Sequence, residues 1–473
     1  MKKHALFLFI FIGVFFLSLA GYFLSKIKDE DKHFVFFVPE HEIVDITIDG
    51  MPVYYQDDNI YPQTMNTLYP VKVRVNHMEK MIRVDKIGKD KFIPIEIFSG
   101  GKSRMYKIQT LPRKFPKISF EKMHEVKEGY ILTSFHGLLL VDPSYAMIFD
   151  TEGCLIWYRG NEDIEMSAFH LQQHKTDDKI RYSMHVQTDR SSLSYIRGKH
   201  LLMNEKFQVI DEVQVLKTDK HPAMPADEHE FVYIDDGHYI VLGYEEKTGR
   251  VDGYDKPVEY VSVIIQEQKD GKVVFEWVSD DYFELFGACQ EKCIGSHNPD
   301  YMHINSVVID PKDGHLVVSS ASGYYLLKIH RKTGEILWRL GGKSDEFKLA
   351  SEYLFYRQHD VQISEDRWVS VFDNQWSSQE GIVELLSENS RVLKLKINED
   401  QKKIEEVKTY PLYTKAPFMG NVQTLQNGDM FVGCGSARGC TAKYIDNNGY
   451  DAFVLFVNKP YFSYRSYITD TLK

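Results

Sequence analysis

Three histidines occupy the same place in three similar segments of the sequence. His229 opens HEFVYIDDGHYIVLG, His303 opens HINSVVIDPKDGHLVVS, and His359 opens HDVQISEDRWVSVFD. In each segment a short alternating apolar run is followed by a polar turn and a second β-rich run. A fourth segment, NVQTLQNGDMFVGCG, begins with Asn421 instead. If the segments are equivalent units around one axis, the three imidazoles meet in a single site.

Such a cluster permits three kinds of chemistry. Three histidines can ligate zinc and leave one coordination position open. They can also bind an anion, or one imidazole can act as a nucleophile while the others transfer protons. The metal site lacks a repeated carboxylate that would orient the second ring nitrogens, although Asp360 and Asp373 are candidates for that role. A single histidine at such a place is more often structural, but recurrence in three dissimilar segments favours function.

The elements that would position these histidines are β-hairpins that recur about every 40–70 residues, a period typical of propeller blades. Several units end in a glycine turn and a strand that carries Trp157, Trp277 or Trp338. The first strand of a blade lines the central channel, so a polar residue at its start faces the axis. We predict six blades, over residues 128–160, 165–216, 227–280, 301–342, 355–412 and 418–465.

The region before the propeller predicts a separate domain. Residues 31–112 alternate polar and apolar residues in short runs punctuated by Gly, Asp and Asn, a pattern typical of a small antiparallel β-sandwich. Two prolines in Leu111–Pro116 favour an extended linker. The predicted fold class is therefore all-β, with a β-sandwich followed by a six-bladed β-propeller over residues 113–473.

Residues 1–30 contain a candidate membrane segment. Ala5–Leu24 is uncharged and is roughly as long as a helix that spans a bilayer core. Lys2 and Lys3 precede it, which predicts a cytoplasmic N-terminus and an exported remainder, either periplasmic or extracellular. We therefore expect a signal anchor that attaches the protein to the membrane. A signal peptide cleaved after Ser18–Ala20 is the alternative.

Composition narrows the classes of partner. The formal net charge of -11 argues against a nucleic-acid partner, which would require a basic face. It does not exclude a small anionic substrate, because the local charge of a pocket can oppose the overall balance. Aromatic residues make up 13% of the chain, which favours a β-rich protein. Nothing in the sequence calls for a cofactor, and the oligomeric state is not predicted.

Five cysteines bear on the chemistry of the exported part. Cys289 lies close to Cys293 in the sequence and Cys434 lies close to Cys440, while Cys154 stands alone. In an exported protein two short-loop disulfides are expected from this spacing. Free thiols remain an alternative, and a zinc site would need ligands from two distant loops.

The histidine segments resemble one known family. MHINSVVI with HLVVSSASGYYLLKIHRKTGEILWRLGG, FYRQHDVQI with WVSVFDNQ, and DEHEFVYIDDGHYIVLG are similar to segments of the bacterial arylsulfotransferases. DITIDG and YKIQTLPRKFP resemble that family's β-sandwich and its junction to a six-bladed propeller. The resemblance implies transfer of a sulfuryl group from a phenolic sulfate ester to another phenol through a covalent sulfohistidine. It covers nearly all of the chain beyond the N-terminal segment.

The resemblance also implies roles for individual residues. His359 matches the nucleophile, while His229 and His303 match the histidines that bind sulfate and transfer protons. Asn305 matches an amide two residues beyond the second histidine.

Aromatic side chains near these motifs, namely Tyr324, Tyr356 and Trp376, are expected to hold an aryl ring. Each of them is, taken singly, more often an ordinary core residue. Asn421, at the start of the fourth segment, is expected to complete the substrate-binding residues.

One position departs from the family's pattern. The family has an arginine directly after Ser-Ser in the strand that follows His-x-Asn, where it binds the sulfate, but here Ala321 stands in its place. Loss of that guanidinium weakens stabilisation of the anion. Arg357 would compensate if residues 357 and 359 lie on the same face of a regular strand. Arg438 is a second candidate.

The sequence therefore predicts an exported sulfotransferase that acts on phenols and aryl sulfates through His359. A non-catalytic propeller of the same family, which binds a ligand or a surface partner, is the first alternative, and Ala321 is its main support. A metal-dependent hydrolase built on the three histidines is the second.

Overall fold

The computed structural model divides into two compact units, residues 1–117 with 153–156, and the remainder. The predicted signal anchor lies outside the described residues. Among the residues that are described, no helix is long and apolar enough to cross a membrane. The structure describes residues 34–38, 45–48, 51–56, 59–62, 71–82, 92–99, 102–109, 116, 118–137, 144–151, 153, 155–160, 168–176, 179–188, 195–251, 254–290, 299–379, 382–385, 387–457 and 461–472.

The N-terminal unit is β-structure, as its alternating sequence predicts. Val73 and Val75 are buried while Arg74 between them is exposed, because successive strand residues face opposite sides. The pairs β1–β7 and β4–β8 are parallel, which corrects the purely antiparallel expectation. The hydrogen-bonded order is β1-β7-β8-β4-β3-β2-β5-β6. The strands are β1 (Phe34–Val38), β2 (Ile46–Ile48), β3 (Met51–Gln56), β4 (Asn59–Pro62), β5 (Val71–Val75), β6 (Met78–Ile82), β7 (Phe92–Ser99) and β8 (Lys102–Gln109).

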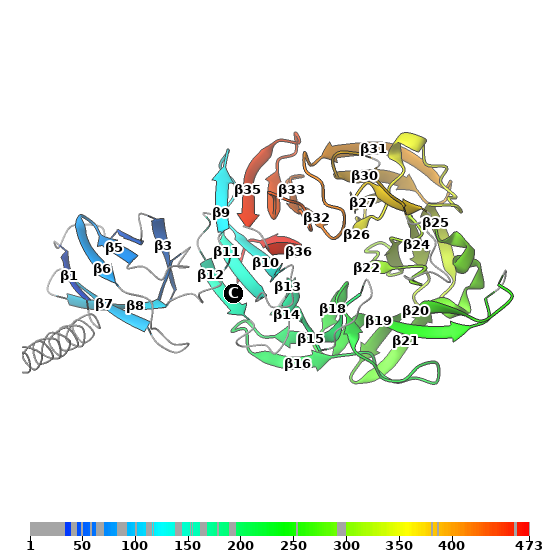
Figure 1. Ribbon diagram of the computed structural model, residues 1–473, viewed down its shortest axis with the longest axis horizontal. Helices are drawn as coiled ribbons and strands as arrows, with labels where there is room; N and C mark the ends of the chain where they lie inside the picture. Colours follow the sequence, from blue (N-terminus) through cyan, green and yellow to red (C-terminus); the bar gives the residue numbers. More distant parts are fainter. Residues whose placement is uncertain are drawn as a thin grey trace, which may run out of the picture. The chain divides into compact units, whose positions relative to one another are not determined.

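The second unit is a six-bladed β-propeller, as predicted. Figure 1 shows its sheets around a common axis, with β36, β13, β18, β22, β26 and β32 innermost. Blade 1 contains β36 (Tyr461–Thr469), β10 (Tyr130–Gly137), β11 (Tyr145–Asp150) and β12 (Leu155–Gly160). Blade 2 contains β13 (Ala168–Lys175), β14 (Ile180–Gln187), β15 (Arg197–Met203), β16 (Val209–Val213) and β17 (Ala226–Asp227). Blade 3 contains β18 (Phe231–Asp235), β19 (His238–Gly249), β20 (Val258–Lys269) and β21 (Lys272–Val278).

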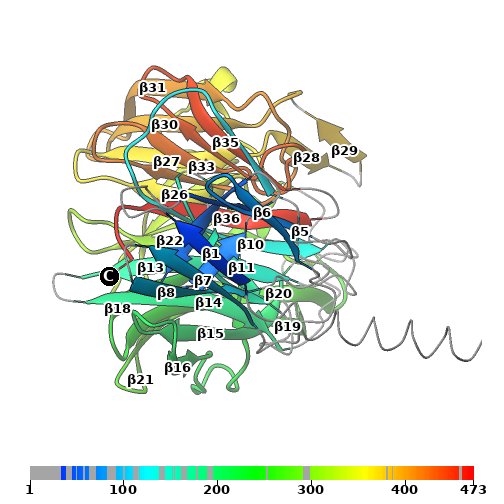
Figure 2. The ribbon, with the colours of Figure 1, turned by 90° about the vertical axis from the view of Figure 1, so that its left-hand side faces the viewer.

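Blades 4 to 6 continue the ring. Blade 5 carries an additional hairpin, which stands out from it in Figure 2. Blade 4 contains β22 (Ile304–Ile309), β23 (Leu316–Ser320), β24 (Tyr325–Ile329) and β25 (Ile336–Gly341). Blade 5 contains β26 (His359–Ile363), β27 (Trp368–Asp373), β30 (Arg391–Asn398) and β31 (Lys403–Pro411), and its additional hairpin is β28 (Trp376–Gln379) with β29 (Ile382–Leu385). Blade 6 contains β32 (Asn421–Thr424), β33 (Met430–Gly433), β34 (Ala442–Ile445), β35 (Asp451–Val457) and β9 (Ile118–Lys122).

Two exchanged strands close the ring, which corrects the predicted limits of the first and last blades. The C-terminal strand β36 pairs with β10 and is the innermost strand of blade 1. The early strand β9 pairs with β35 and is the outermost strand of blade 6. Local sequence patterns cannot reveal these pairings, because each joins residues from opposite ends of the propeller.

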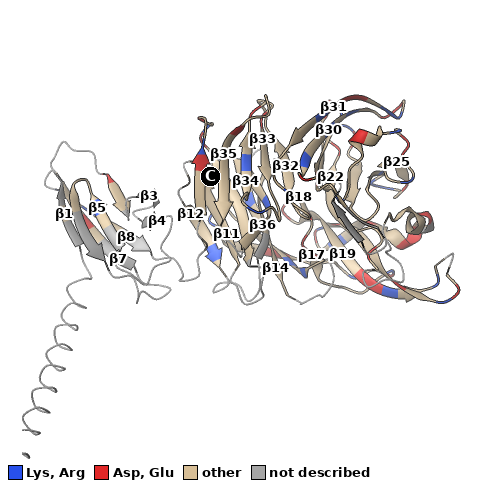
Figure 3. Cartoon of the chain, turned by 45° about the horizontal axis from the view of Figure 1, so that its top comes forward, with Lys and Arg blue, Asp and Glu red and all other residues tan. Residues whose placement is uncertain are grey.

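Apolar packing between neighbouring blades forms the core. Trp277 and Trp338, on the outermost strands of blades 3 and 4, are 1% and 2% exposed. Trp277 belongs to a cluster with residues of blade 4, and Trp338 to a cluster with residues of blade 5. Each tryptophan therefore fixes its blade against the next one along the chain. Figure 3 shows charged residues of both signs interspersed over the outer strands and loops.

Candidate functional site

The three histidines lie where the innermost strands of blades 3, 4 and 5 begin. His229 precedes β18 by two residues, His303 directly precedes β22, and His359 is the first residue of β26. All three are buried, at 3%, 5% and 4% exposure. The prediction that equivalent places in successive blades carry them is therefore confirmed by their positions in the fold.

Backbone irregularities aim these side chains. His303 has φ 46°, and the pairing of β22 with β23 shifts register between Ile304 and Ser306. In β26 the shift lies between His359 and Gln362, and Asp360 has φ 53°. A bulge of this kind bends a strand and redirects its side chains. Strict alternation of faces therefore does not hold at this end of the channel.

A fourth histidine lies at the same bulge in blade 2. His170 in β13 has φ 55°, and the register of β13 with β14 shifts between Phe169 and Gln172. Its Nε2 is 2.8 Å from the hydroxyl of Tyr467 on β36. Sequence reasoning missed His170 because blade 2 has the weakest repeat, and AFHLQQH lacks the turn spacing of the other segments.

Carboxylates orient two of the three predicted histidines. Asp227 Oδ1 lies 2.6 Å from His229 Nδ1 and accepts the His229 backbone N–H at 3.0 Å. Asp300 Oδ2 lies 2.7 Å from His303 Nδ1, and its Oδ1 accepts the His303 N–H at 2.8 Å. Each carboxylate thus fixes both the backbone and the ring of its histidine and directs the Nε2 side toward the site.

The pair with Asp227 also shifts the pKa of His229. Burial by itself lowers the pKa of His229, but the charge and hydrogen bond of Asp227 outweigh burial and raise it above its usual value. The His229 and His303 ring centroids are 4.9 Å apart, with the rings nearly perpendicular. The pKa of Asp300 is lowered, because the charge of His303 and its hydrogen bonds outweigh burial. This half of the site is therefore suited to hold a proton.

His359 has a different partner. Its Nδ1 is 2.8 Å from the amide oxygen of Asn374 and 3.0 Å from the carbonyl of Arg357. Both atoms are acceptors, so Nδ1 carries the proton and Nε2 has a free electron pair. The Met419 N–H, 3.2 Å from Nε2, fits the same tautomer. Burial lowers the pKa of His359 well below its usual value, and the nearby histidines lower it further.

The two carboxylates suggested by the sequence do not orient histidines. Asp360 accepts the Val422 N–H at 2.7 Å, and Asp373 pairs with Arg391 at 2.8 Å. The residues missed were Asp227, Asp300 and Asn374. A usable signal was present, since an aspartate stands two or three residues before each of the first two histidines, in DEHEF and DYMHIN.

Asn305 and Asn421 have fully buried side-chain amides. Each lies at the beginning of the innermost strand of its blade, β22 or β32. Asn305 donates from Nδ2 to the carbonyl of Gln358 at 2.7 Å, while no hydrogen-bond donor to its Oδ1 occurs among the described residues. Asn421 donates to the Ser466 carbonyl at 2.7 Å and accepts the Ser466 N–H at 2.9 Å. Its amide thus joins β32 to β36, and its role in substrate binding stays a prediction.

Loops of blades 4 and 5 place the predicted aromatic residues in two pairs. The guanidinium of Arg357 lies 4.7 Å from the centre of the Trp376 ring. The rings of Tyr324 and Tyr356 are 5.2 Å apart, edge to face. Arg357 precedes β26 and has φ 54°, so the regular-strand geometry expected for residues 357 and 359 is wrong.

The position that lacks the expected arginine lies next to the site. The Ala321 N–H donates to the carbonyl of His303 at 3.0 Å, and the side chain is fully buried. Arg438, the second candidate for compensation, is exposed in its loop. The loop's disulfide joins Cys434 and Cys440, as predicted. Cys293 lies outside the described residues, so its pairing with Cys289 stays a prediction.

The three histidines do not form a compact metal-ligand set. Among the described residues, the only group whose ligand atoms all lie within 4.8 Å of one another is Asp310, Asp313 and Glu399. Lys328 Nζ lies 2.6, 2.5 and 3.0 Å from oxygens of these three carboxylates. An ammonium group thus occupies that cluster, which makes it an ion-pair network between blades 4 and 5.

Residues 121–449 match the family model Arylsulfotransferase (ASST), which covers well over half of the chain. No curated protein matches.

Among solved structures, a protein of unknown function from Bacteroides caccae is 10% identical, with 73% of this chain and 100% of that chain covered and a TM-score of 0.40. Apo AztD from Citrobacter koseri is 8% identical, with 73% of this chain and 98% of that chain covered and a TM-score of 0.34. The family match covers blades 3, 4 and 5, which carry the three histidines, and the chain belongs to the arylsulfotransferase family.

Proposed function

We propose that this protein transfers a sulfuryl group from a phenolic sulfate ester to a phenol, with His359 as the covalent intermediate. The observation that carries the proposal is the unequal set of partners. His359 faces the neutral amide of Asn374, whereas His229 and His303 face the carboxylates of Asp227 and Asp300. A nucleophile needs a free electron pair, and a proton donor needs a charge partner.

In the first step Nε2 of His359 attacks sulfur. The N–S bond forms as the S–O bond to the phenol breaks, and the electron pair leaves on the phenolate oxygen. A protonated His229 or His303 supplies a proton to that oxygen. The Met419 N–H, which bonds Nε2 in the free site, is released to donate to a sulfuryl oxygen.

In the second step the oxygen of an acceptor phenol attacks the same sulfur. The neutral histidine that gave its proton takes one from the acceptor, and the electron pair of the N–S bond returns to Nε2. The free enzyme is thereby regenerated. Fixed donors around the sulfuryl oxygens lower both barriers, because they need no reorganisation during reaction.

A direct test uses a chromogenic aryl sulfate with a second phenol as acceptor. We expect release of the donor phenol, formation of the acceptor sulfate, and loss of both in His359→Ala. His330→Ala is a matched control, because His330 lies in the turn between β24 and β25. The absence of transfer across several donors and acceptors would overturn the proposal.

One observation favours the alternative of a non-catalytic binding propeller. The arginine that the family pattern calls for is Ala321 here, so one strong anion-binding group is absent from the site. If aryl sulfates bind with equal affinity to the wild type and to His359→Ala, without turnover, the binding function is the correct one.

We further propose that the protein is exported and anchored in the membrane by Ala5–Leu24, with the propeller outside the cytoplasm. The charge-free length of that segment and the preceding lysines support this. Protease digestion of intact cells should remove the propeller, and the protein should remain in the membrane fraction. Recovery of the full chain in the soluble cytoplasmic fraction would contradict the proposal.

A further inference from the structure

A buried arginine of blade 1 contacts residues of three other blades. Arg465 projects from β36 and is 1% exposed. Its Nη1 is 3.0 Å from Glu230 Oε2 and 3.4 Å from Asp360 Oδ1, and its Nη2 donates to the carbonyl of Asn305 at 2.7 Å. These partners come from blades 3, 5 and 4. One guanidinium from blade 1 therefore spans the centre of the ring.

Arg465 lies directly behind the histidines. Glu230 follows His229, Asp360 follows His359, and Asn305 stands two residues after His303. Each partner of the guanidinium is thus one or two residues beyond a site histidine in the chain. Burial by itself lowers the pKa of Arg465, but Glu230 and other groups around it raise it well above its usual value. The group remains a cation.

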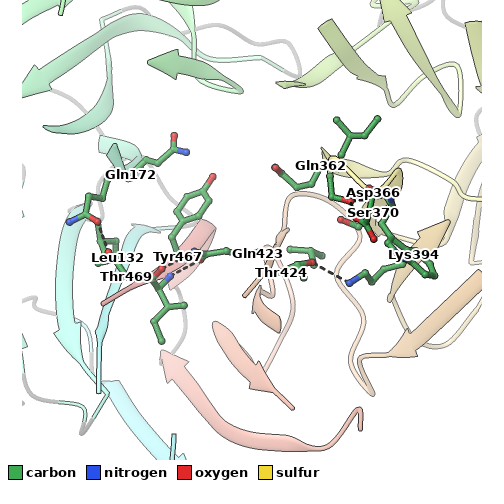
Figure 4. Close-up of a pocket in the computed structure, with 16 residues that line it drawn as sticks. Leu132, Gln172, Gln362, Asp366, Ser370, Lys394, Gln423, Thr424, Tyr467 and Thr469 are labelled. Carbon is green, nitrogen blue, oxygen red and sulfur yellow. Dashed lines mark hydrogen bonds between the residues drawn. The ribbon is translucent and has the colours of Figure 1, made fainter. Parts of the chain in front are cut away.

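A cavity lies on the far side of Arg465. Tyr467, whose hydroxyl is 3.3 Å from Arg465 Nη1, lines a cavity of about 560 Å³ together with Gln172, Gln362 and Gln423. Figure 4 shows Tyr467 and Gln172 on one side of it and Gln362 across from them.

This cavity is the opposite mouth of the channel. Tyr467 and Gln362 stand two residues beyond Arg465 and Asp360 on the same strands, and none of the three histidines lines the cavity. It also reaches Asp366, whose side chain is 66% exposed, so water enters it freely.

We propose that Arg465 closes the axial channel between this solvent-open mouth and the histidine site. The inference rests on the proposed function. Its consequence is protection of the sulfohistidine, since a site that excludes water suppresses hydrolysis of a reactive intermediate. In the side reaction, the oxygen of water bonds to sulfur as the N–S bond breaks. The electron pair returns to His359 Nε2, and hydrogen sulfate and a proton leave.

The test measures how the sulfuryl group partitions between hydrolysis and transfer. The ratio of inorganic sulfate to acceptor sulfate is determined at fixed acceptor concentration. Removal of Arg465 alone would leave two buried carboxylates without their cation and destabilise the fold. The Arg465 variants are therefore made in a protein that also carries Glu230→Gln and Asp360→Asn, so that the partners left behind are uncharged. In that background, Arg465→Ser opens the passage and Arg465→Met fills it with an apolar chain of similar length.

We expect the ratio to rise about tenfold or more in the Arg465→Ser protein and to stay near the wild-type value in the Arg465→Met protein. A merely structural role would lower hydrolysis and transfer together and leave the ratio unchanged. Equal ratios in the two proteins would overturn the inference.

Arg465→Lys in the otherwise unchanged chain gives a second measurement that keeps the positive charge. A shorter ammonium cannot reach Glu230, Asp360 and Asn305 together, so the ratio should also rise. A ratio equal to that of the wild type would contradict the seal. If the wild-type protein itself transfers no sulfuryl group, the proposed function is wrong. That result differs from a wild type that transfers the group and variants that leave the ratio unchanged, which would overturn only the seal.

Discussion

His359 Nδ1 lies 2.8 Å from the amide oxygen of Asn374, and no carboxylate takes that place. The amide fixes the tautomer, as a carboxylate would, but it does not stabilise the charged ring to the same degree. Asn374 is itself held by hydrogen bonds to the carbonyls of Ala416 and Met419, at 2.7 and 3.0 Å. Burial lowers the pKa of His359 and keeps the nucleophile neutral, while Asn374 fixes its ring and tautomer. Asp227, in contrast, favours a protonated His229.

Substitution of Asp227 by asparagine tests this division. The variant keeps the shape of the side chain but removes the charge that raises the pKa of His229, so the proton donor is lost. We expect kcat/KM to fall by about 10² or more for aryl sulfates with poor leaving phenols and much less for good ones. Asp300→Asn is the matched comparison. A uniform loss across leaving groups would contradict the assignment of a proton donor.

The pH dependence follows from the two shifted pKa values. His359 must be neutral to attack, and its pKa is lowered, so activity persists as pH falls below 6.5, the ordinary value. His229 must be protonated, and its pKa is raised, so its proton remains as pH rises above 6.5. The profile of kcat/KM should therefore be flat through pH 6.5. An acid limb centred at or above 6.5 would show that His359 is not the group that must be neutral.

Arg357 stays the candidate to replace the arginine missing at Ala321, although residues 357–359 do not form the regular strand that the sequence argument required. Its backbone carbonyl lies 3.0 Å from His359 Nδ1, and its guanidinium lies over Trp376. Arg357→Ala should lower kcat/KM for aryl sulfates by roughly tenfold or more, and Arg357→Lys should retain part of it, because the positive charge remains. Unchanged sulfuryl transfer in the alanine variant would remove Arg357 from the site.

Acid should destabilise the propeller through its buried histidines. Burial lowers the pKa of His174 to about 3 and that of His185 to about 4. Below pH 6.5 the unfolded chain binds protons that the folded chain excludes, so the free energy of unfolding falls as pH falls. Each such histidine contributes about 1.4 kcal/mol per pH unit in that window.

Urea unfolding between pH 7 and pH 5 measures this slope. His174→Gln should make it shallower, because one proton-binding group of the unfolded chain is gone. His330→Gln, in a surface turn, serves as the control. An identical slope in wild type and His174→Gln would contradict the prediction.

Much of this architecture follows from the sequence because its signals are local. The alternation of polar and apolar residues predicted the strands, and the recurrence of His229, His303 and His359 predicted one site. The ring closure by β36 and β9 was not predictable, since no local pattern reports a pairing across the whole propeller.

The chemistry within the site depended on details that a pattern does not contain. The bulges at His303 and Asp360 break the alternation on which the position of Arg357 was predicted. Asn374 lies fifteen residues from His359 in the sequence, and Arg465 comes from the last strand of the chain. Asn374 reaches His359 through the pairing of β26 with β27 in one blade, whereas Arg465 reaches the site because the blades close into a ring.

The central claim is a covalent bond between sulfur and His359. The most direct measurement is peptide mass spectrometry after rapid mixing with an aryl sulfate in the absence of acceptor, with quenching under alkaline conditions. We predict the mass of one SO₃ group on the peptide that contains His359, formed in step with a burst of released phenol. The addition should be absent from His359→Ala and should disappear when a phenol acceptor is added. Turnover without any modification of that peptide, or with the group on His229 or His303, would contradict the assignment.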